Sequence, residues 1–280
     1  MYKSLNPGMV GIGVGFAEAI ELAGKHGFGG LDVGIRQIAE LVEAEGAESI
    51  RSRFAAAGVR PGSCSLLPGT LSAPYDQWAA GAADLPRLAG IAEALGYTRA
   101  GIVMLPFHET LDFDANSALH VERLRQVGCI LADHGISLGI EYVSQETRRA
   151  GYENPFLHDL AGTLALCEAA GGHNLGVLLD AFHWYCAGET LDDVAALRPE
   201  QVVLVHVSDA PAGRSLDEHV AFERALPGET GVIDLAGFGR TLRGIGYDGP
   251  VTCEPFVKLA DLSPDAAAAK VSAALDAVIG

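Results

Sequence analysis

Eight short apolar runs, each followed by a segment with helical periodicity, recur along the chain and constrain its fold more than any other feature. The runs lie near residues 2–6, 29–34, 59–66, 98–105, 137–142, 174–180, 201–207 and 250–254. Regular alternation of strands with helices is typical of a parallel sheet covered by helices. Eight such units in 280 residues are what a closed (β/α)8 TIM barrel requires, so we expect an α/β fold with a single barrel domain over residues 1–280.

The helical segments that separate the predicted strands have recognisable ends. Five glycines stand between a helical segment and the next strand, where a residue able to adopt positive φ is favoured: Gly27, Gly58, Gly96, Gly135 and Gly246. The helical pattern continues through residues 38–57, which we interpret as one helix.

Four polar residues lie at the ends of four successive apolar runs. Glu141 follows SLGI, Asp180 follows LGVLL, His206 follows VVLV and Glu254 follows PVTC. Parallel strands bring such residues to one edge of a barrel, where an unpaired charge on a buried strand is costly. A shared cation removes that cost, so the sequence predicts one divalent metal ion, Mn²⁺, Co²⁺, Mg²⁺ or Zn²⁺, bound by all four. Ligands from four successive strands also favour a barrel over an open, doubly wound sheet.

Composition excludes several classes of function. With 19 basic and 36 acidic residues, the net charge of −17 repels nucleic acids and anionic membranes. The segment GIGVGF lacks the last glycine of the dinucleotide-binding pattern. No apolar run is long enough to span a membrane and no signal peptide is recognisable, so we expect a cytoplasmic protein; formation of a homo-oligomer is left open. The five cysteines form no CxxC pair and are expected to be buried, reduced thiols.

The loops after the predicted strands contain four candidates for substrate binding. His183 and Trp184 follow Asp180 in DAFHW, with a surface histidine and packing against a neighbouring loop as the alternatives. Asp209, in HVSDA, is placed to orient the His206 imidazole or to hold a hydroxyl. Arg224, in FERALPGETG, can bind a substrate oxygen, or it is an exposed charge that anchors its own loop.

Five segments in order, GIEYV, NLGVLLDAFHWYCAG, VVLVHVSDAPAG, ERALPGETGVIDL and GYDGPVTCEPF, resemble the sugar phosphate isomerase/epimerase family of xylose isomerase-like TIM barrels. Within it, they are most similar to the branch of 2-keto-myo-inositol isomerase and inosose dehydratase. The resemblance implies a divalent metal on the four strand-end residues, with His183 and Arg224 at positions that contact substrate. The related endonuclease IV branch, which binds three zinc ions, has further ligands on earlier strands that this sequence offers in few places.

We therefore expect a metal-dependent isomerase or epimerase that acts on a small keto-sugar or keto-cyclitol. Glu141 and Glu254 are the expected catalytic residues, one removing and the other returning a proton through a metal-stabilised enediolate. Two alternatives stay open. One is a dehydratase or eliminating lyase acting at the same site on a keto-inositol or 3-keto-glycoside, and the other is a metal-containing sugar-binding barrel without turnover.

Overall fold

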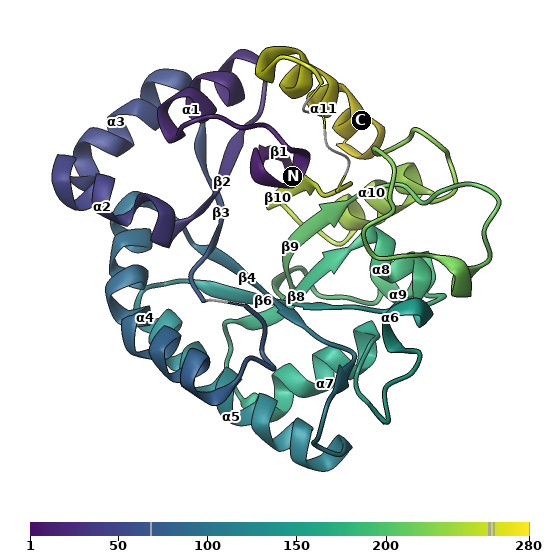
Figure 1. The fold of residues 1–280 in the computed structure, drawn as a ribbon. Coiled ribbons are helices and arrows are strands. Elements are labelled where there is room, and N and C mark those ends of the chain that lie inside the picture. The colour runs from purple at the N-terminus through teal and green to yellow at the C-terminus, as the bar shows by residue number, and fades with distance from the viewer. Residues whose placement is uncertain (68, 257–258, 260, 280) are drawn as a thin grey trace.

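A computed structural model describes residues 1–67, 69–256, 259 and 261–279, and it shows eight parallel strands closed into a barrel. Figure 1 shows these strands inside a ring of helices. Around the barrel the strands run β1 (Tyr2–Leu5), β10 (Pro250–Cys253), β9 (Val202–Val207), β8 (Leu175–Asp180), β6 (Ser137–Tyr142), β4 (Arg99–Met104), β3 (Arg60–Ser65) and β2 (Gly30–Gly34). The predicted (β/α)8 barrel is confirmed, and each predicted strand corresponds to one of these eight.

Helices connect the strands on the outside of the barrel. The longer ones are α1 (Phe16–Lys25), α2 (Ile35–Glu45), α3 (Ala47–Ala57), α4 (Tyr75–Leu95), α5 (Phe113–Asp133), α7 (Leu160–Ala170), α10 (Leu235–Gly244) and α11 (Pro264–Ile279). Shorter elements are α6 (Glu146–Arg149), α8 (Ala181–Cys186), α9 (Leu191–Ala195), η1 (Gly8–Val10), η2 (Pro199–Gln201), η3 (Leu216–Glu218) and the antiparallel pair β5 (Phe107–His108) and β7 (Asn154–Pro155).

Two expectations about the helical layer need correction. Residues 38–57 are not one helix, because Gly46 has φ of 83° and separates α2 from α3. The prediction of five buried thiols is wrong for Cys129, which is exposed on α5, whereas the other four cysteines are buried and all five are free. The five glycines predicted at helix ends all have positive φ.

The barrel interior is closed beneath the carboxyl ends of its strands. Leu178 and Leu204 stand two residues before Asp180 and His206, on the same strand faces, and so lie one layer deeper in the barrel. Together with Val203 they form a buried apolar cluster separate from the main core. Gly101 faces them. A Cβ at this position would lie 3.0 Å from Leu178 Cδ1, so glycine leaves the space that the Leu178 side chain fills.

The first strand and the last helix close the structure. Strand β1 pairs with β10, and its Lys3 Nζ donates to Ser272 Oγ at 3.0 Å and to Asp276 Oδ1 at 2.6 Å on α11. Asp276 is largely exposed, so its ion pair contributes at most about 1 kcal/mol. Most of the stabilisation at this closure comes from the apolar face of α11, including Val271 and Leu275, which are almost inaccessible to solvent.

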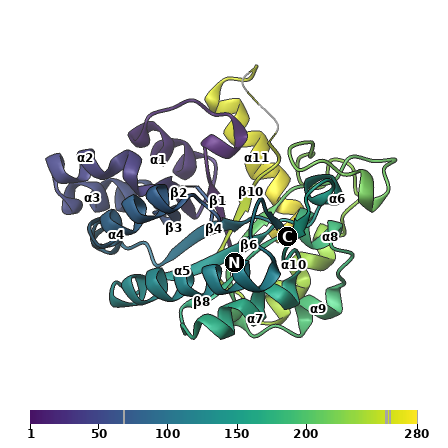
Figure 2. The same ribbon diagram turned by 60° about the horizontal axis from the view of Figure 1, so that its bottom comes forward.

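A long segment between β9 and α10 lies over one side of the carboxyl-terminal edge. Figure 2 shows it projecting beyond the ring of helices, next to α6. Backbone hydrogen bonds between Asp209 and Ala225, of 2.9 and 2.8 Å, fold this segment back upon itself. Among the helices of the described residues, no helix is long and apolar enough to cross a membrane.

Candidate metal centre and active site

Glu141, Asp180, His206 and Glu254 converge at the carboxyl-terminal edge of the barrel. Each offers one ligand atom, and these four atoms all lie within 4.8 Å of one another. The first three end or nearly end β6, β8 and β9, while the Glu254 N–H donates to Val207 O and continues the pairing of β10 with β9. His206 Nδ1 is 3.2 Å from Glu254 Oε2 and 3.8 Å from Glu141 Oε1. All four side chains are buried, and the structure brings together the four predicted ligands.

The electrostatics of this cluster fit a cation. Burial, followed by repulsion from Glu254, raises the pKa of the Glu141 carboxyl well above its usual value. Burial disfavours the His206 imidazolium, but the neighbouring carboxylates outweigh it and raise the pKa of His206 to about 9. Glu141 Oε1 is buried and has no hydrogen-bond partner among the described residues. A divalent cation bound by three carboxylates and an imidazole would replace the protons that otherwise neutralise these charges.

Asp180 is held from two directions. Its Oδ1 accepts hydrogen bonds from the Phe182 and His183 N–H groups, at 2.6 and 3.3 Å, and so caps α8. Its Oδ2 accepts from Arg224 Nη1 at 2.7 Å. Burial alone would raise the pKa of Asp180, but the Arg224 charge together with His183 and the other neighbouring groups outweighs burial and lowers that pKa below its usual value.

Arg224 lies inside the carboxylate cluster, although it comes from the long β9–α10 segment. Its guanidinium is stacked between the rings of Phe182 and Phe256, with Cζ 4.5 and 4.8 Å from their centroids. Nη1 also approaches Glu254 Oε2 at 3.5 Å, and Nε donates to Ala221 O at 2.8 Å. Phe256 has φ of 53°, the one positive value at a non-glycine position in the described chain, which places backbone strain beside the site.

The alternative in which Arg224 is an exposed anchor of its loop does not match these contacts. Its side chain is 2% exposed. The two acids of the loop have other partners: Glu223 binds Arg214 at 2.6 Å and Glu229 accepts from the Leu226 N–H at 3.0 Å. The guanidinium therefore lies among the carboxylates, where it is paired with Asp180.

His183 packs behind the carboxylates. Its Nε2 lies 4.0 Å from Glu141 Oε1 and 3.2 Å from Arg224 Nη2. On the other side, its Nδ1 lies 2.7 Å from Gln145 Nε2. Burial lowers the pKa of His183 to about 3, so the imidazole is neutral at ordinary pH. Gln145 was missed from the sequence, although a polar residue four positions after Glu141 is a signal that could have found it.

Two predicted substrate-binding residues have other roles. Trp184 is buried, packs against Phe238 of α10 at a ring distance of 5.2 Å, and donates to Thr190 O at 3.2 Å. These contacts match the packing alternative, although the partner is helix α10 and not a neighbouring loop. Asp209 has an exposed fraction of 0% and accepts from four backbone N–H groups, those of Ala210, Thr230, Gly231 and Ile233. Its carboxylate therefore shapes the β9–α10 segment.

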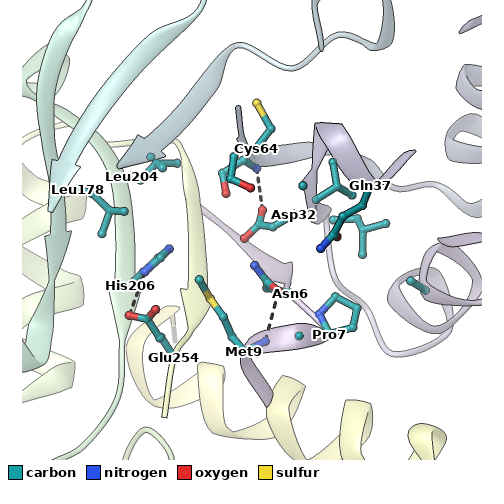
Figure 3. Close-up of a pocket in the computed structure, with 18 of the residues that line it drawn as sticks. Asn6, Pro7, Met9, Asp32, Gln37, Cys64, Leu178, Leu204, His206 and Glu254 are labelled. Carbon is teal, nitrogen blue, oxygen red and sulfur yellow. Dashed lines mark hydrogen bonds and ion pairs between the residues drawn. The ribbon is translucent and has the colours of Figure 1, made fainter. Parts of the chain in front are cut away.

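A cavity of about 770 Å³ opens in front of the cluster. Glu141, His206 and Glu254 line it, whereas Asp180, His183 and Arg224 lie behind these three. Figure 3 shows His206 and Glu254 on one side of the cavity and Gln37 on the other, with Asp32 between them. The cavity can thus present a bound molecule to two carboxylates and an imidazole at once.

Asp32 is a further buried acid, and the sequence analysis missed it. Its Oδ1 accepts from Ser4 Oγ and the Ser63 N–H, both at 2.6 Å, and its Oδ2 accepts from Thr252 Oγ1 at 2.5 Å. Burial raises the pKa of this carboxyl, while the three hydrogen bonds oppose that shift. A charged residue within the apolar run at 29–34 was the available signal, because such a residue needs partners on neighbouring strands.

Comparison with known proteins agrees with this geometry. The sequence model of the family described as xylose isomerase-like TIM barrel matches residues 20–277. The chain belongs to this family. D-psicose 3-epimerase of Agrobacterium fabrum is 28% identical over 253 residues, which are 87% of this chain and 80% of that protein.

Two further relatives illustrate the range of similarity. Inosose isomerase of Bacillus licheniformis is 26% identical over 142 residues, 50% of this chain, and the matched region spans about half, 47%, of that relative. A xylose isomerase domain protein from Alicyclobacillus acidocaldarius has a solved structure that superposes with a TM-score of 0.87 at 29% identity, covering 99% of this chain and 97% of that one.

Proposed function

We propose that this chain is a divalent-metal-dependent isomerase or epimerase of a keto-sugar or keto-cyclitol. One observation carries the proposal: Glu141 and Glu254, from strands separated by β8 and β9, both line one cavity beside His206. Two carboxylates that reach the same bound molecule can take a proton from carbon and return one. The sugar-converting relatives, an epimerase and an isomerase, support this chemistry.

The four buried ligands would hold one cation, which supplies positive charge that polarises a substrate carbonyl and stabilises an enediolate. The two cavity-lining carboxylates differ in their surroundings. Glu141 Oε1 is unpartnered and its pKa is raised by burial, whereas Glu254 Oε2 contacts both His206 and Arg224. We propose that Glu141, whose Oε1 is free of hydrogen-bond partners among the described residues, takes the proton and that Glu254 returns one.

The residues behind the cluster keep these carboxylates in position. Arg224 bridges Asp180 and Glu254, and His183 closes the space between Arg224 and Glu141. None of Asp180, His183 and Arg224 lines the cavity, so none is assigned a direct contact with substrate. Asp180 is assigned to metal binding, and His183 and Arg224 to charge balance and orientation of the ligands.

Proton exchange with solvent is the decisive experiment. Keto-inositols and ketohexoses are incubated in deuterated water with the purified protein and Mn²⁺, Co²⁺, Mg²⁺ or Zn²⁺, and NMR follows deuterium entering the carbon next to the carbonyl. We expect exchange that depends on added metal and is followed by isomer or epimer formation. Binding without exchange would show a sugar-binding barrel, and ultraviolet absorbance of a conjugated enone would show a dehydratase.

A further inference from the structure

The cavity extends well beyond the candidate metal centre, toward the amino-terminal half of the barrel. Its far wall is formed by the ends of β1 to β3 and by the first turns of α1 and α2. Figure 3 shows Gln37 and Pro7 across the cavity from His206 and Glu254. We call this part, lined by Asn6, Ile12, Phe16, Gln37, Ile38 and Ser65, the distal chamber.

The size of the cavity exceeds what proton transfer on a small sugar needs. Its volume of about 770 Å³ lies in the upper part of the range of about 300 to 1,000 Å³ found for sites that enclose drug-sized ligands. A free monosaccharide is smaller than such ligands. A free monosaccharide with its carbonyl carbon beside Glu141 and Glu254 would not fill the distal chamber, which water would then occupy.

The lining of the distal chamber combines apolar surface with neutral polar groups. Ile12, Phe16 and Ile38 contribute aliphatic and aromatic surface. Gln37 and Ser65 line the same space and are exposed, so their amide and hydroxyl groups are available to a ligand. Such a wall favours a molecule with an apolar body and a few hydroxyl or ether oxygens.

Charge excludes an anionic ligand at this end. Among the described residues that line the cavity there is no lysine or arginine, whereas Asp32, Glu141 and Glu254 are carboxyl-bearing. Arg224 lies behind this wall and is occupied by Asp180. No described residue of the wall offers a phosphate group in the distal chamber a cation, and the net charge of −17 repels anions from the molecule as a whole.

We propose that the substrate is a keto-sugar or keto-cyclitol carrying an uncharged, partly apolar substituent, such as a glycoside, which occupies the distal chamber while the keto ring lies beside Glu141 and Glu254. This inference rests on the proposed function and adds the substrate class to it. Apolar surface of the substituent would be buried against Ile12, Phe16 and Ile38, and its oxygens would bond to Gln37 and Ser65.

The test compares three probes that share one ring: glucose oxidised to the ketone at C3, its phenyl β-glucoside, and its 6-phosphate. Calorimetry measures their dissociation constants for the metal-loaded protein, and NMR in deuterated water measures proton exchange. We expect the phenyl glucoside to bind at least about tenfold more tightly than the free sugar, and the phosphate to bind more weakly than either.

Two variants on one helix locate the effect. Gln37→Trp fills the distal chamber, and we expect it to bring the dissociation constants of glucoside and free sugar together. Glu40→Trp lies on the same helix, is exposed and does not line the cavity, so it should keep the wild-type difference. Circular dichroism checks that both variants are folded.

Failure of the inferred substrate class and failure of the proposed function give different results. Two results would overturn the inferred substrate class and leave the proposed function standing. One is proton exchange in which the free sugar or the phosphate binds as tightly as the glucoside, or more tightly. The other is a preference for the glucoside that survives in Gln37→Trp. Absence of exchange and binding for all three probes, and for the keto-inositols and ketohexoses, would overturn the proposed function and the inference with it.

Discussion

Arg224 provides the positive charge on which the geometry of the candidate metal centre depends. The guanidinium reaches Asp180 and Glu254 from one nitrogen while its plane is stacked between Phe182 and Phe256. A lysine keeps the charge but has neither the planar face nor the fork of donors. The role of this residue is therefore testable by a substitution that leaves the net charge unchanged.

In Arg224→Lys we expect kcat to fall by about 10-fold to 100-fold, with a smaller change in KM, because Glu254 loses part of its support. Metal content, kcat and KM are measured on the same preparation. Arg214→Lys is the matched control, since Arg214 belongs to the same segment but pairs with the half-exposed Glu223 at the surface. Wild-type kinetics in Arg224→Lys would remove this residue from the site.

The proposed proton transfer makes a separate prediction for Glu141 and Glu254. Glu141→Gln and Glu254→Gln each remove one proton-transfer group, so solvent proton exchange should drop by about 10² to 10⁴-fold in both. Glu146→Gln alters a half-buried acid on α6 that is near Glu141 in sequence but does not line the cavity, so it should behave as wild type. An exchange rate retained in either test variant with metal bound would contradict the two-carboxylate mechanism.

At the scale of elements, α5 is tied to the β3–α4 connection by a buried polar contact. His120 Nδ1 lies 2.8 Å from Asn116 O and its ring packs on Phe156, while Arg123 of the same helix donates to Leu71 O. Burial lowers the pKa of His120 from 6.5 to about 4. The folded protein therefore holds this imidazole neutral where an unfolded chain would protonate it.

The sign of the pH dependence follows from that difference. Between pH 6.5 and about 4 the unfolded state binds more protons at this position than the folded state, so the free energy of unfolding falls as pH falls through this window. The stability is fully present above pH 6.5, and the loss over the window is about 3 kcal/mol. His120→Phe removes this contribution.

Urea denaturation between pH 7 and 4.5 checks the prediction. The stability advantage of wild type over His120→Phe should shrink as the pH is lowered. His173→Phe, which alters an exposed histidine, controls for the general effect of losing an imidazole and should follow wild type. A constant difference between wild type and His120→Phe across this range would show that His120 does not resist protonation in the folded protein.

The strands and the metal-ligand candidates could be predicted from the sequence, whereas one helix boundary could not. Strand positions and the four ligands follow from apolar runs that end in a polar residue, because the period and the desolvation cost are local properties of the sequence. The break at Gly46 was missed, since a glycine within a helical pattern costs only about 1 kcal/mol and does not by itself end a helix.

Residues whose roles depend on long-range packing were harder to assign. Trp184 and Asp209 follow strand ends as substrate-binding residues do, yet the first packs against Phe238 and the second binds backbone amides of its own segment. Asp32 was missed because its three partners come from three other strands. The cavity itself is a property of the closed barrel, so its distal chamber had no signature in the sequence.

At the scale of the whole molecule, the barrel brings the ends of four strands together around like charges. Glu141, Asp180 and Glu254 repel one another at the site, and protonation of Glu141 and His206 relieves this repulsion when no cation is present. A cation that binds the folded barrel and not the unfolded chain stabilises the fold by mass action. Closure of the barrel and metal binding should therefore be coupled.

We expect Mn²⁺ or Zn²⁺ to raise the Tm by several degrees, because a ligand at 100 times its dissociation constant contributes about 2.7 kcal/mol. The increase should be larger at pH 8.5 than at pH 6, since the cation must displace protons from Glu141, whose pKa is raised, and from His206, whose pKa is about 9. Differential scanning fluorimetry with metal added and then removed by a chelator measures both effects. Asp180→Asn, which weakens the ligand set, should lose most of the increase. If added metal left the Tm unchanged at both pH values, protons and Arg224 alone would balance these charges. That result would contradict both the metal site and the metal-dependent mechanism.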